Sequence, residues 1–143
     1  MVLVHDDAND VLQNTFLKAW KGLENFRGDA QISTWLYRIA TNETLTFLAQ
    51  KRMRNVISMD ETEDILMRNM QADSYFDGDE AQLKLQQAIL TLPEKQRLVF
   101  NMRFYEEMSY GQMSKILETS EGALKASYHH ASKKVEEFLK KEQ

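Results

Sequence analysis

The chain has 143 residues, a formal net charge of −4 and no cysteine. The lack of cysteine excludes disulfides and thiolate metal sites, and no apolar run approaches the roughly 20 residues that a membrane-spanning helix needs. The first ten residues also lack the basic start and the long apolar core of a signal peptide. We therefore expect a cytoplasmic protein without membrane insertion.

The negative charge is concentrated in the middle of the chain. Residues 58–88 carry two basic and eight acidic residues, whereas the segments before and after them each carry one more basic than acidic residue. Apolar periodicity is also lost from residue 55 to residue 80, and we predict an acidic linker, partly ordered at best, over 57–80. Such a linker would repel DNA, so it should not lie along the phosphates.

The first predicted helix runs from Ala8 to about Leu23. Its apolar residues recur at helical spacing and predict an inward stripe of Leu12, Phe16, Ala19, Trp20 and Leu23. The opposite face carries four polar residues that could meet a partner: Asp10, Gln13, Asn14 and Lys18. A face that is simply solvated would have the same composition, and for this helix alone that is the simpler interpretation.

A loop containing Gly28 leads to a longer helix, predicted from about Gln31 to Arg54 with Asp29 as its cap. Its predicted buried residues are Ile32, Leu36, Ile39, Leu45 and Leu48. It also mixes aromatic, amide and basic side chains: Trp35, Tyr37, Arg38, Asn42, Lys51, Arg52 and Arg54. This mixture is typical of binding to single-stranded nucleic acid, because bases stack on rings and phosphates meet cations. The alternative places Trp35 in the core and uses the basic end only to complement the helix dipole.

The C-terminal part begins with two further predicted helices. The first starts at Glu80 and is broken at Leu92 and Pro93, and proline suits the first turn of the next helix, from Glu94 to about Tyr105. Their predicted apolar positions are Leu83, Leu85, Ala88, Ile89, Leu98, Val99 and Met102, with Phe104 as a further candidate.

The last two predicted helices match a helix-turn-helix motif, in which the second helix enters the major groove of DNA. Ser109 and Ser120 are predicted to cap them. The predicted inward residues are Met113, Ile116 and Leu117, then Leu124, Tyr128, Ala131, Val135 and Phe138. The outward hydrogen-bonding residues of the second helix are Lys125, Ser127, His129, His130, Ser132 and Lys133. An ordinary amphipathic hairpin with a solvated outer face is the alternative.

The turn of this motif has an unusual residue. Glu118 stands where many such motifs have glycine, because that position often has a positive φ.

The sequence shows no pattern typical of catalysis. The three histidines are His5, His129 and His130, and the adjacent pair diverges on a helix, which is poor geometry for binding one metal ion. We find no phosphate-binding glycine loop and no G-x-S-x-G motif, and the carboxylates fall in the linker or on helix surfaces. We therefore predict no catalytic residue, no metal and no cofactor.

Two stretches together resemble a known family. FRGDAQISTWLYRIATN, residues 26–42, resembles part of the second conserved region of bacterial sigma factors of the extracytoplasmic-function group. LPEKQRLVF, residues 92–100, together with the helix-turn-helix that follows, resembles their fourth region. The acidic segment falls where that family has a variable linker.

The resemblance implies an all-α protein of two small helical modules, 1–56 and 81–143, joined by the acidic linker 57–80. It also implies an initiation subunit whose partners are core RNA polymerase, promoter DNA and an anti-sigma factor. The first module would bind polymerase and read the melted minus-ten promoter element, and the second would read the minus-thirty-five element as duplex. A helix-turn-helix regulator that is not a polymerase subunit, and a decoy that binds an anti-sigma factor, are the alternatives.

The family's roles can be carried over to matching positions. The polymerase contact would be Asp10, Gln13, Asn14 and Lys18. The minus-ten contacts would be Phe26, Arg27, Asp29, Ser33, Trp35, Arg38, Asn42, Lys51, Arg52 and Arg54, with the loop 26–33 forming a pocket for a flipped base. The minus-thirty-five contacts would be Ser120, Lys125, Ser127, His129, His130 and Lys133.

The chain departs from the family in two respects. Family members usually begin with about one more helix, so we expect a truncated or late-starting chain whose Leu12 stripe is under-covered. The family also often has arginines where this chain carries Lys125, Ser127 and His130. The minus-thirty-five sequence should therefore differ from better-known cases.

Overall fold

The computed structural model describes residues 5–54, 64, 68 and 80–141. These residues form α-helices and one 3-10 helix, with no strand among them, which confirms the all-α prediction. The chain divides into two compact units within Val2–Thr62 and Glu63–Gln143, and each is considered by itself. The predicted linker lies outside the described residues except for Asp64, Arg68 and Glu80, the last of which begins a helix.

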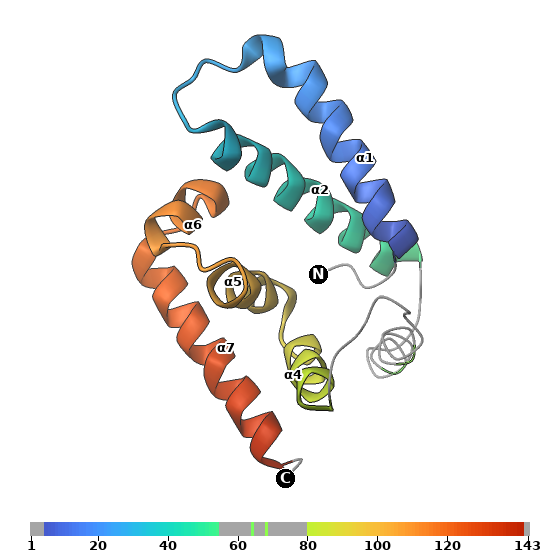
Figure 1. The fold of residues 1–143 in the computed structure, drawn as a ribbon, viewed down its shortest axis with the longest axis vertical. Helices are drawn as coiled ribbons and strands as arrows, with labels where there is room; N and C mark the ends of the chain where they lie inside the picture. The colour runs from blue at the N-terminus through green and yellow to red at the C-terminus, as the bar shows by residue number, and fades with distance from the viewer. Residues whose placement is uncertain (1–4, 55–63, 65–67, 69–79, 142–143) are drawn as a thin grey trace. The chain divides into compact units, whose positions relative to one another are not determined.

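The N-terminal unit is an antiparallel hairpin of α1 (His5–Gly22) and α2 (Ile32–Arg54), with the 3-10 helix η1 (Leu23–Asn25) following α1 (Figure 1). Ion pairs link the two helices at separate levels: Lys51 Nζ lies 2.6 Å from Asp7 Oδ2, and Lys18 pairs with Glu43. Near the connection, a Cβ added to Gly22 would lie only 3.2 Å from the ring of Trp35. The helices approach closely there because glycine has no side chain.

The small residues of α1 are buried, in contrast to the sequence prediction. Val11, Thr15 and Ala19 are buried, and the Thr15 hydroxyl donates to the Val11 carbonyl at 2.7 Å. Helical spacing puts these residues on the side of α1 that carries Lys18 and Gly22, which both contact α2. The predicted inward stripe is therefore wrong except at Ala19, since the other four residues are exposed: Leu12, Phe16, Trp20 and Leu23. Their exposure confirms the expectation that the Leu12 stripe is under-covered.

The start and the burial of α2 also differ from the prediction. The helix begins at Ile32, and the N–H of Trp35 donates to the carbonyl of Gln31 at 3.1 Å, so Gln31 rather than Asp29 occupies the cap position. Ile32 is exposed, whereas the buried residues of the helix are Thr34 and Thr41. The other four residues predicted to be buried are only half-buried: Leu36, Ile39, Leu45 and Leu48.

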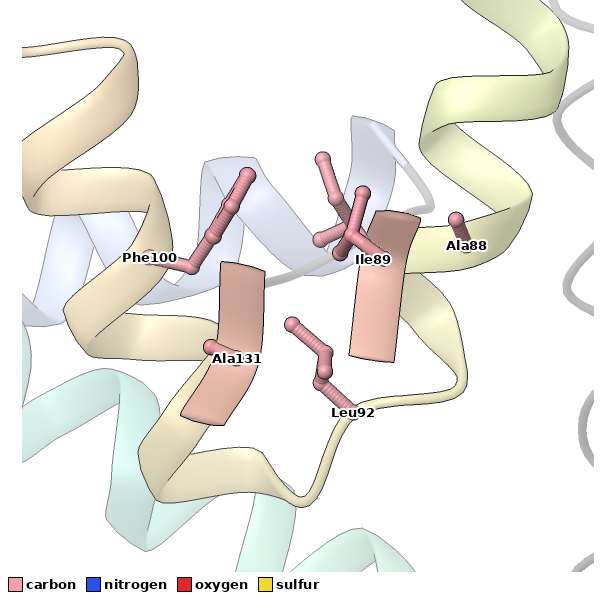
Figure 2. Close-up of a cluster of buried hydrophobic side chains, with 6 residues drawn as sticks. Ala88, Ile89, Leu92, Phe100 and Ala131 are labelled. Atoms are coloured by element: carbon pink, nitrogen blue, oxygen red, sulfur yellow. The ribbon is translucent and has the colours of Figure 1, made fainter. Parts of the chain in front are cut away.

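In the C-terminal unit, α4 (Glu80–Leu90), α5 (Glu94–Phe104) and α7 (Glu121–Lys141) share a hydrophobic cluster. Its buried members are Ala88, Ile89, Leu92, Phe100, Ala131 and Val135. Figure 2 shows the labelled side chains of this cluster meeting from α4, the α4–α5 connection, α5 and α7. The burial predicted for Ala88, Ile89, Ala131 and Val135 is confirmed.

A second cluster joins α5, α6 (Tyr110–Leu117) and the first turns of α7. Its buried members are Val99, Met102, Met108, Met113, Ile116 and Leu124, and Tyr128 packs against both clusters. The candidate core position Phe104 is wrong, because that ring is 46% exposed and stacks on Phe100 with centroids 5.2 Å apart.

The ends of these helices are closed by local hydrogen bonds. The N–H of Gln112 donates to Ser109 Oγ at 3.1 Å while the N–H of Ser109 donates to Gln112 Oε1 at 3.0 Å, which forms a capping box. The N–H of Ala123 donates to Ser120 Oγ at 3.2 Å. Both predicted caps are therefore confirmed. At the α4–α5 turn, the guanidinium of Arg97 donates to the carbonyl of Leu90, which as the last residue of α4 has no helical partner, and to the carbonyl of Leu92 in the turn.

The turn between α6 and α7 depends on one left-handed residue. Glu118 has φ 52° and ψ 40°, which confirms the positive φ expected at this position. For a residue with a Cβ, this conformation costs about 1–2 kcal/mol, and glycine avoids that cost.

We expect Glu118→Gly to be about 1 kcal/mol more stable to unfolding than Glu118→Ala, because both remove the carboxylate but only glycine adopts the left-handed conformation without strain. The alanine variant is thus the matched control. Urea unfolding of the full chain, followed by helical circular dichroism, measures the difference. Equal stabilities of the two variants would show that this backbone position is not strained.

Candidate nucleic-acid interface

The outer face of α7 is defined by its buried face. Leu124 and Ala131 point into the core, so residues on the other side of the helix face solvent. An exposed row with spacings of four, three and four residues follows that side: Gly122, Ala126, His129 and Lys133. Gly122 and Ala126, the first two residues of this row, are small, so the helix backbone can approach a surface closely there. An alanine methyl group also suits contact with a thymine methyl group. Gly122 and Ala126 were not predicted, because neither has a hydrogen-bonding side chain.

The predicted duplex-binding residues divide by exposure. Those that are exposed are Lys125, His129, His130 and Lys133. Ser127 is half-buried, and the Ser120 hydroxyl is engaged in the helix cap. The prediction that Ser132 faces outward is wrong, because its hydroxyl oxygen is buried. The exposed set leaves a surface of two lysines and two imidazoles along α7.

Three helices meet at the ring of Tyr110, at the start of α6. The guanidinium carbon of Arg103, from α5, lies 4.9 Å from the ring centroid, and Lys125 Nζ, from α7, lies 5.7 Å from it. Arg103 also donates to the Met108 carbonyl at 2.8 Å. Cations are attracted to the face of an aromatic ring, so Tyr110 helps to hold Lys125 beside the exposed row of α7. Arg103 and Tyr110 were not predicted, because no sequence spacing brings them next to Lys125.

In the N-terminal unit, an open pocket of about 350 Å³ lies between the end of α1, η1 and α2. It is lined by Lys18, Gly22, Asn25, Trp35, Ile39, Asn42 and Glu43. Its lining brings an indole ring and two amide side chains together, which suits a flat polar ligand such as a nucleobase. Asn25 and Glu43 were not predicted, since their place in the pocket depends on how α1 packs on α2.

The pocket contains some of the predicted minus-ten residues and not others. Trp35 and Asn42 line it, and Phe26 packs against Trp35 with ring centroids 5.0 Å apart. The other eight predicted residues, Phe26 included, are outside its lining; among them Arg27, Asp29 and Ser33 are exposed, and Arg38 is half-buried. Gly28, with φ +75°, turns the loop that carries Arg27 and Asp29. Trp35 is half-buried. It is therefore neither a fully buried core residue nor a fully exposed binding residue, the two alternatives that the sequence offered.

The remaining predicted residues lie on both helices of the hairpin. At the end of α2, Lys51 is held by Asp7, whereas Arg52 and Arg54 are exposed. On α1, all four residues of the predicted polymerase face are exposed: Asp10, Gln13, Asn14 and Lys18. Lys18 is engaged with Glu43 of α2, so its ammonium group takes part in packing the hairpin.

The described residues 5–54, 64, 68 and 80–141 contain neither a candidate metal site nor a candidate membrane span. No group of three or more histidine, aspartate or glutamate side chains could hold a metal ion there. No helix among these residues is long and apolar enough to cross a membrane.

A helix-turn-helix with an exposed second helix, combined with an aromatic and amide pocket on a helical hairpin, is typical of a DNA-binding protein. Family models described as Sigma-70 region 2 and Sigma-70 region 4 match residues 4–54 and 82–135 respectively. The RNA polymerase sigma-H factor of Pseudomonas aeruginosa is 30% identical over 146 residues, covering 95% of this chain and 76% of that protein. The ECF RNA polymerase sigma factor SigW of Bacillus subtilis is 30% identical over 145 residues, covering 96% and 77%. The chain therefore belongs to the sigma-70 family, in its extracytoplasmic-function group.

Solved structures share this fold. The sigma factor RpoE of Bartonella quintana, crystallised with the anti-sigma factor NepR, has a TM-score of 0.72 at 20% identity, covering 97% of this chain and 84% of that one. CnrH in complex with the cytosolic domain of CnrY has a TM-score of 0.68 at 21% identity, covering 99% of this chain and 76% of that one. At these identities the likeness concerns the fold.

Lys125→Ala should weaken binding of the full chain to its cognate duplex, because the lysine lies beside the exposed row of α7. For a phosphate contact, we expect the slope of log K against log salt concentration to fall by about one. Lys140→Ala is the matched control, since it removes the same charge at the far end of α7, where Lys140 pairs with Glu136. Fluorescence anisotropy at several salt concentrations measures both variants. An identical response of the two would show that Lys125 contributes only general charge.

Proposed function

We propose that this chain is a sigma factor that directs RNA polymerase to specific promoters and initiates transcription there. The observation that carries this proposal is the match of both sigma regions, in the family's order, at residues 4–54 and 82–135. The partners are core RNA polymerase and promoter DNA, and the chain works in the cytoplasm with the polymerase. It contributes binding rather than catalysis and needs no cofactor.

Each module binds a different promoter element. The module 81–143 reads the minus-thirty-five element as duplex through the outer face of α7, with Lys125, His129 and Lys133 near the groove. The module 1–56 binds the polymerase and the melted minus-ten element, and the linker 57–80 joins the two. The contrast between the exposed ridge of α7 and the pocket lined by Trp35 supports this division, because a duplex admits a helix whereas an unpaired base needs a cavity.

The pocket between α1 and α2 holds a base flipped out of the melted strand. Asn42 lies on its lining and can form paired hydrogen bonds with a free base edge, while the ring of Trp35 offers a stacking surface. Unstacking a base costs a few kcal/mol, which such contacts offset. The cations Arg52 and Arg54, exposed at the end of α2, attract the strand's phosphates.

An anti-sigma factor controls the activity. Two structures that share the fold support this: the Bartonella quintana sigma factor was crystallised with the anti-sigma factor NepR, and CnrH was solved in complex with the cytosolic domain of CnrY. The two alternatives, a regulator that is not a polymerase subunit and a decoy for an anti-sigma factor, lack the ability to start transcription with core polymerase.

Asn42→Ala should impair promoter opening while leaving duplex binding and thermal stability unchanged, because Asn42 is exposed at the pocket. Thr46→Ala is the matched control, one turn further along α2, also exposed and outside the pocket lining. Permanganate footprinting reports strand opening, and a duplex gel shift reports upstream binding. Normal opening in the folded Asn42→Ala protein would reject the pocket as the base site. Joint loss of stability and of both binding modes would instead assign Asn42 to the fold.

Run-off transcription with purified core polymerase tests the proposed function itself. The full chain should support transcription from its promoter, and Asp10→Lys should reduce core-polymerase affinity without lowering the melting temperature, because Asp10 is exposed on α1. Lys18 is unsuitable for this test, since a substitution there also breaks its pair with Glu43. Duplex binding without any polymerase binding would favour the non-sigma regulator. Absence of promoter binding by every form of the chain would favour the decoy.

A further inference from the structure

The outer face of α7 carries two adjacent imidazoles that diverge from its centre line. His129 and His130 are both exposed, and their ring centroids lie 6.0 Å apart with the ring planes at 60°. At about 100° of rotation per residue, they stand roughly 50° to either side of the line through Ala126 and Lys133, opposite the buried face. The two rings therefore spread across the width of the exposed face.

This spread suits a helix that lies in a DNA groove. The major groove has a phosphate backbone along each of its two sides, and a recognition helix lies between them. When the line through Ala126 and Lys133 faces the bases, His129 leans toward one backbone and His130 toward the other. A neutral imidazole offers one donor and one acceptor, whereas a protonated imidazole offers two donors and a positive charge. The protonated form is therefore the better partner for phosphates.

The charged side chains of α7 near the two rings are all cations. Within one helical turn of the rings these are Lys125, Lys133 and Lys134. The carboxylates in the same rows, Glu136 and Glu137, are seven residues away, which is about 10 Å along the helix axis. A proton on either ring thus adds a positive charge where α7 supplies only positive charge, and DNA phosphates supply the compensating negative charge.

The helices packed on α7 meet it beside these lysines. From α6, Tyr110 lies with its ring centroid 5.7 Å from Lys125 Nζ, on the side of His129. From α5, Gln96 accepts a hydrogen bond from Lys134 Nζ at 3.1 Å, on the side of His130. The charged residues next to Gln96 in the sequence are Glu94, Lys95 and Arg97. Helix α4 packs on α7 through the apolar cluster of Ala131 and Val135.

We propose that His129 and His130 take up protons when the outer face of α7 binds duplex DNA, so that acid strengthens promoter binding by this chain. The inference rests on the proposed reading of duplex DNA by α7 and adds a regulation to it. The bound state holds the protons more tightly than the free state. The added affinity is therefore present at low pH and is lost as the pH rises through the range in which the bound imidazoles lose their protons.

The test measures binding of the full chain to duplex DNA without polymerase. The probe is a short duplex that the chain selects from a random-sequence library, at constant ionic strength and with EDTA to remove metal ions that bind imidazoles. From about pH 8 to about pH 6, the affinity should rise roughly tenfold or more, because each tenfold difference in proton affinity between the two states contributes up to about tenfold. Calorimetry in buffers of different ionisation enthalpy should show proton uptake on binding.

Variants assign the proton uptake to the two rings. Changing both His129 and His130 to glutamine should abolish the pH dependence, because glutamine retains hydrogen-bonding groups but never becomes charged. Each single change should remove part of the uptake. Arginine at both positions should give pH-independent binding at least as tight as that of the unchanged chain in acid. His5→Gln, which alters the histidine at the start of α1, is the matched control and should retain the full pH dependence.

The outcomes separate this inference from the proposed function. An affinity of the unchanged chain that does not vary with pH would overturn the inference, and so would a pH dependence that survives both glutamine changes. Absence of duplex binding at either pH overturns it too. Proton uptake without run-off transcription would reject the sigma function and support the inference. Transcription without proton uptake would support the sigma function and reject the inference.

Discussion

The buried face of α7 is the constraint on which the C-terminal unit depends. Ala131 and Val135 complete the cluster with α4 and α5, Leu124 completes the cluster with α5 and α6, and Tyr128 packs against both. The shorter helices meet through α7, which contacts all three. Because this face must be inside, the exposed row on the other side of α7 must be outside. The hydrophobic effect thereby determines which residues can reach a DNA groove.

The N-terminal hairpin is held by a different balance of forces. Its two helices approach through small residues and through ion pairs near their ends, and the partly exposed pairs contribute only about 0–1 kcal/mol each. The largest apolar residues of α1 remain exposed. A unit with so little buried apolar area gains stability from anything that covers it. The described residues of the C-terminal unit, by contrast, bury two hydrophobic clusters.

The two candidate DNA sites also differ in their chemistry. On α7, small residues and cations occupy an exposed helix face, which suits a groove whose shape is already present. On the hairpin, Trp35 and Asn42 lie in a concave site, and the indole is held by Phe26 and by its close approach to Gly22. A concave site can take a base only after the duplex has opened. The two candidate sites thus lie in different units of one chain.

The sequence by itself determined the helices, the caps and part of the core of the C-terminal unit, although the burial of Leu90, Leu92, Phe100 and Met108 was not predicted. Each helix there has one apolar stripe, and a cap such as Ser109 or Ser120 bonds within three residues, so the information is local. On α1 there are two apolar rows, and hydropathy favoured the larger one, Leu12 with Phe16 and Trp20. Only the tertiary structure decided that the smaller row faces α2, because close helix approach depends on side-chain volume at Gly22 and Ala19 rather than on hydrophobicity. Only the tertiary structure also decided that Arg103 and Lys125 contact the ring of Tyr110, and that Asn25 and Asn42 line one pocket. Those neighbours are distant in sequence, and packing alone brings them together.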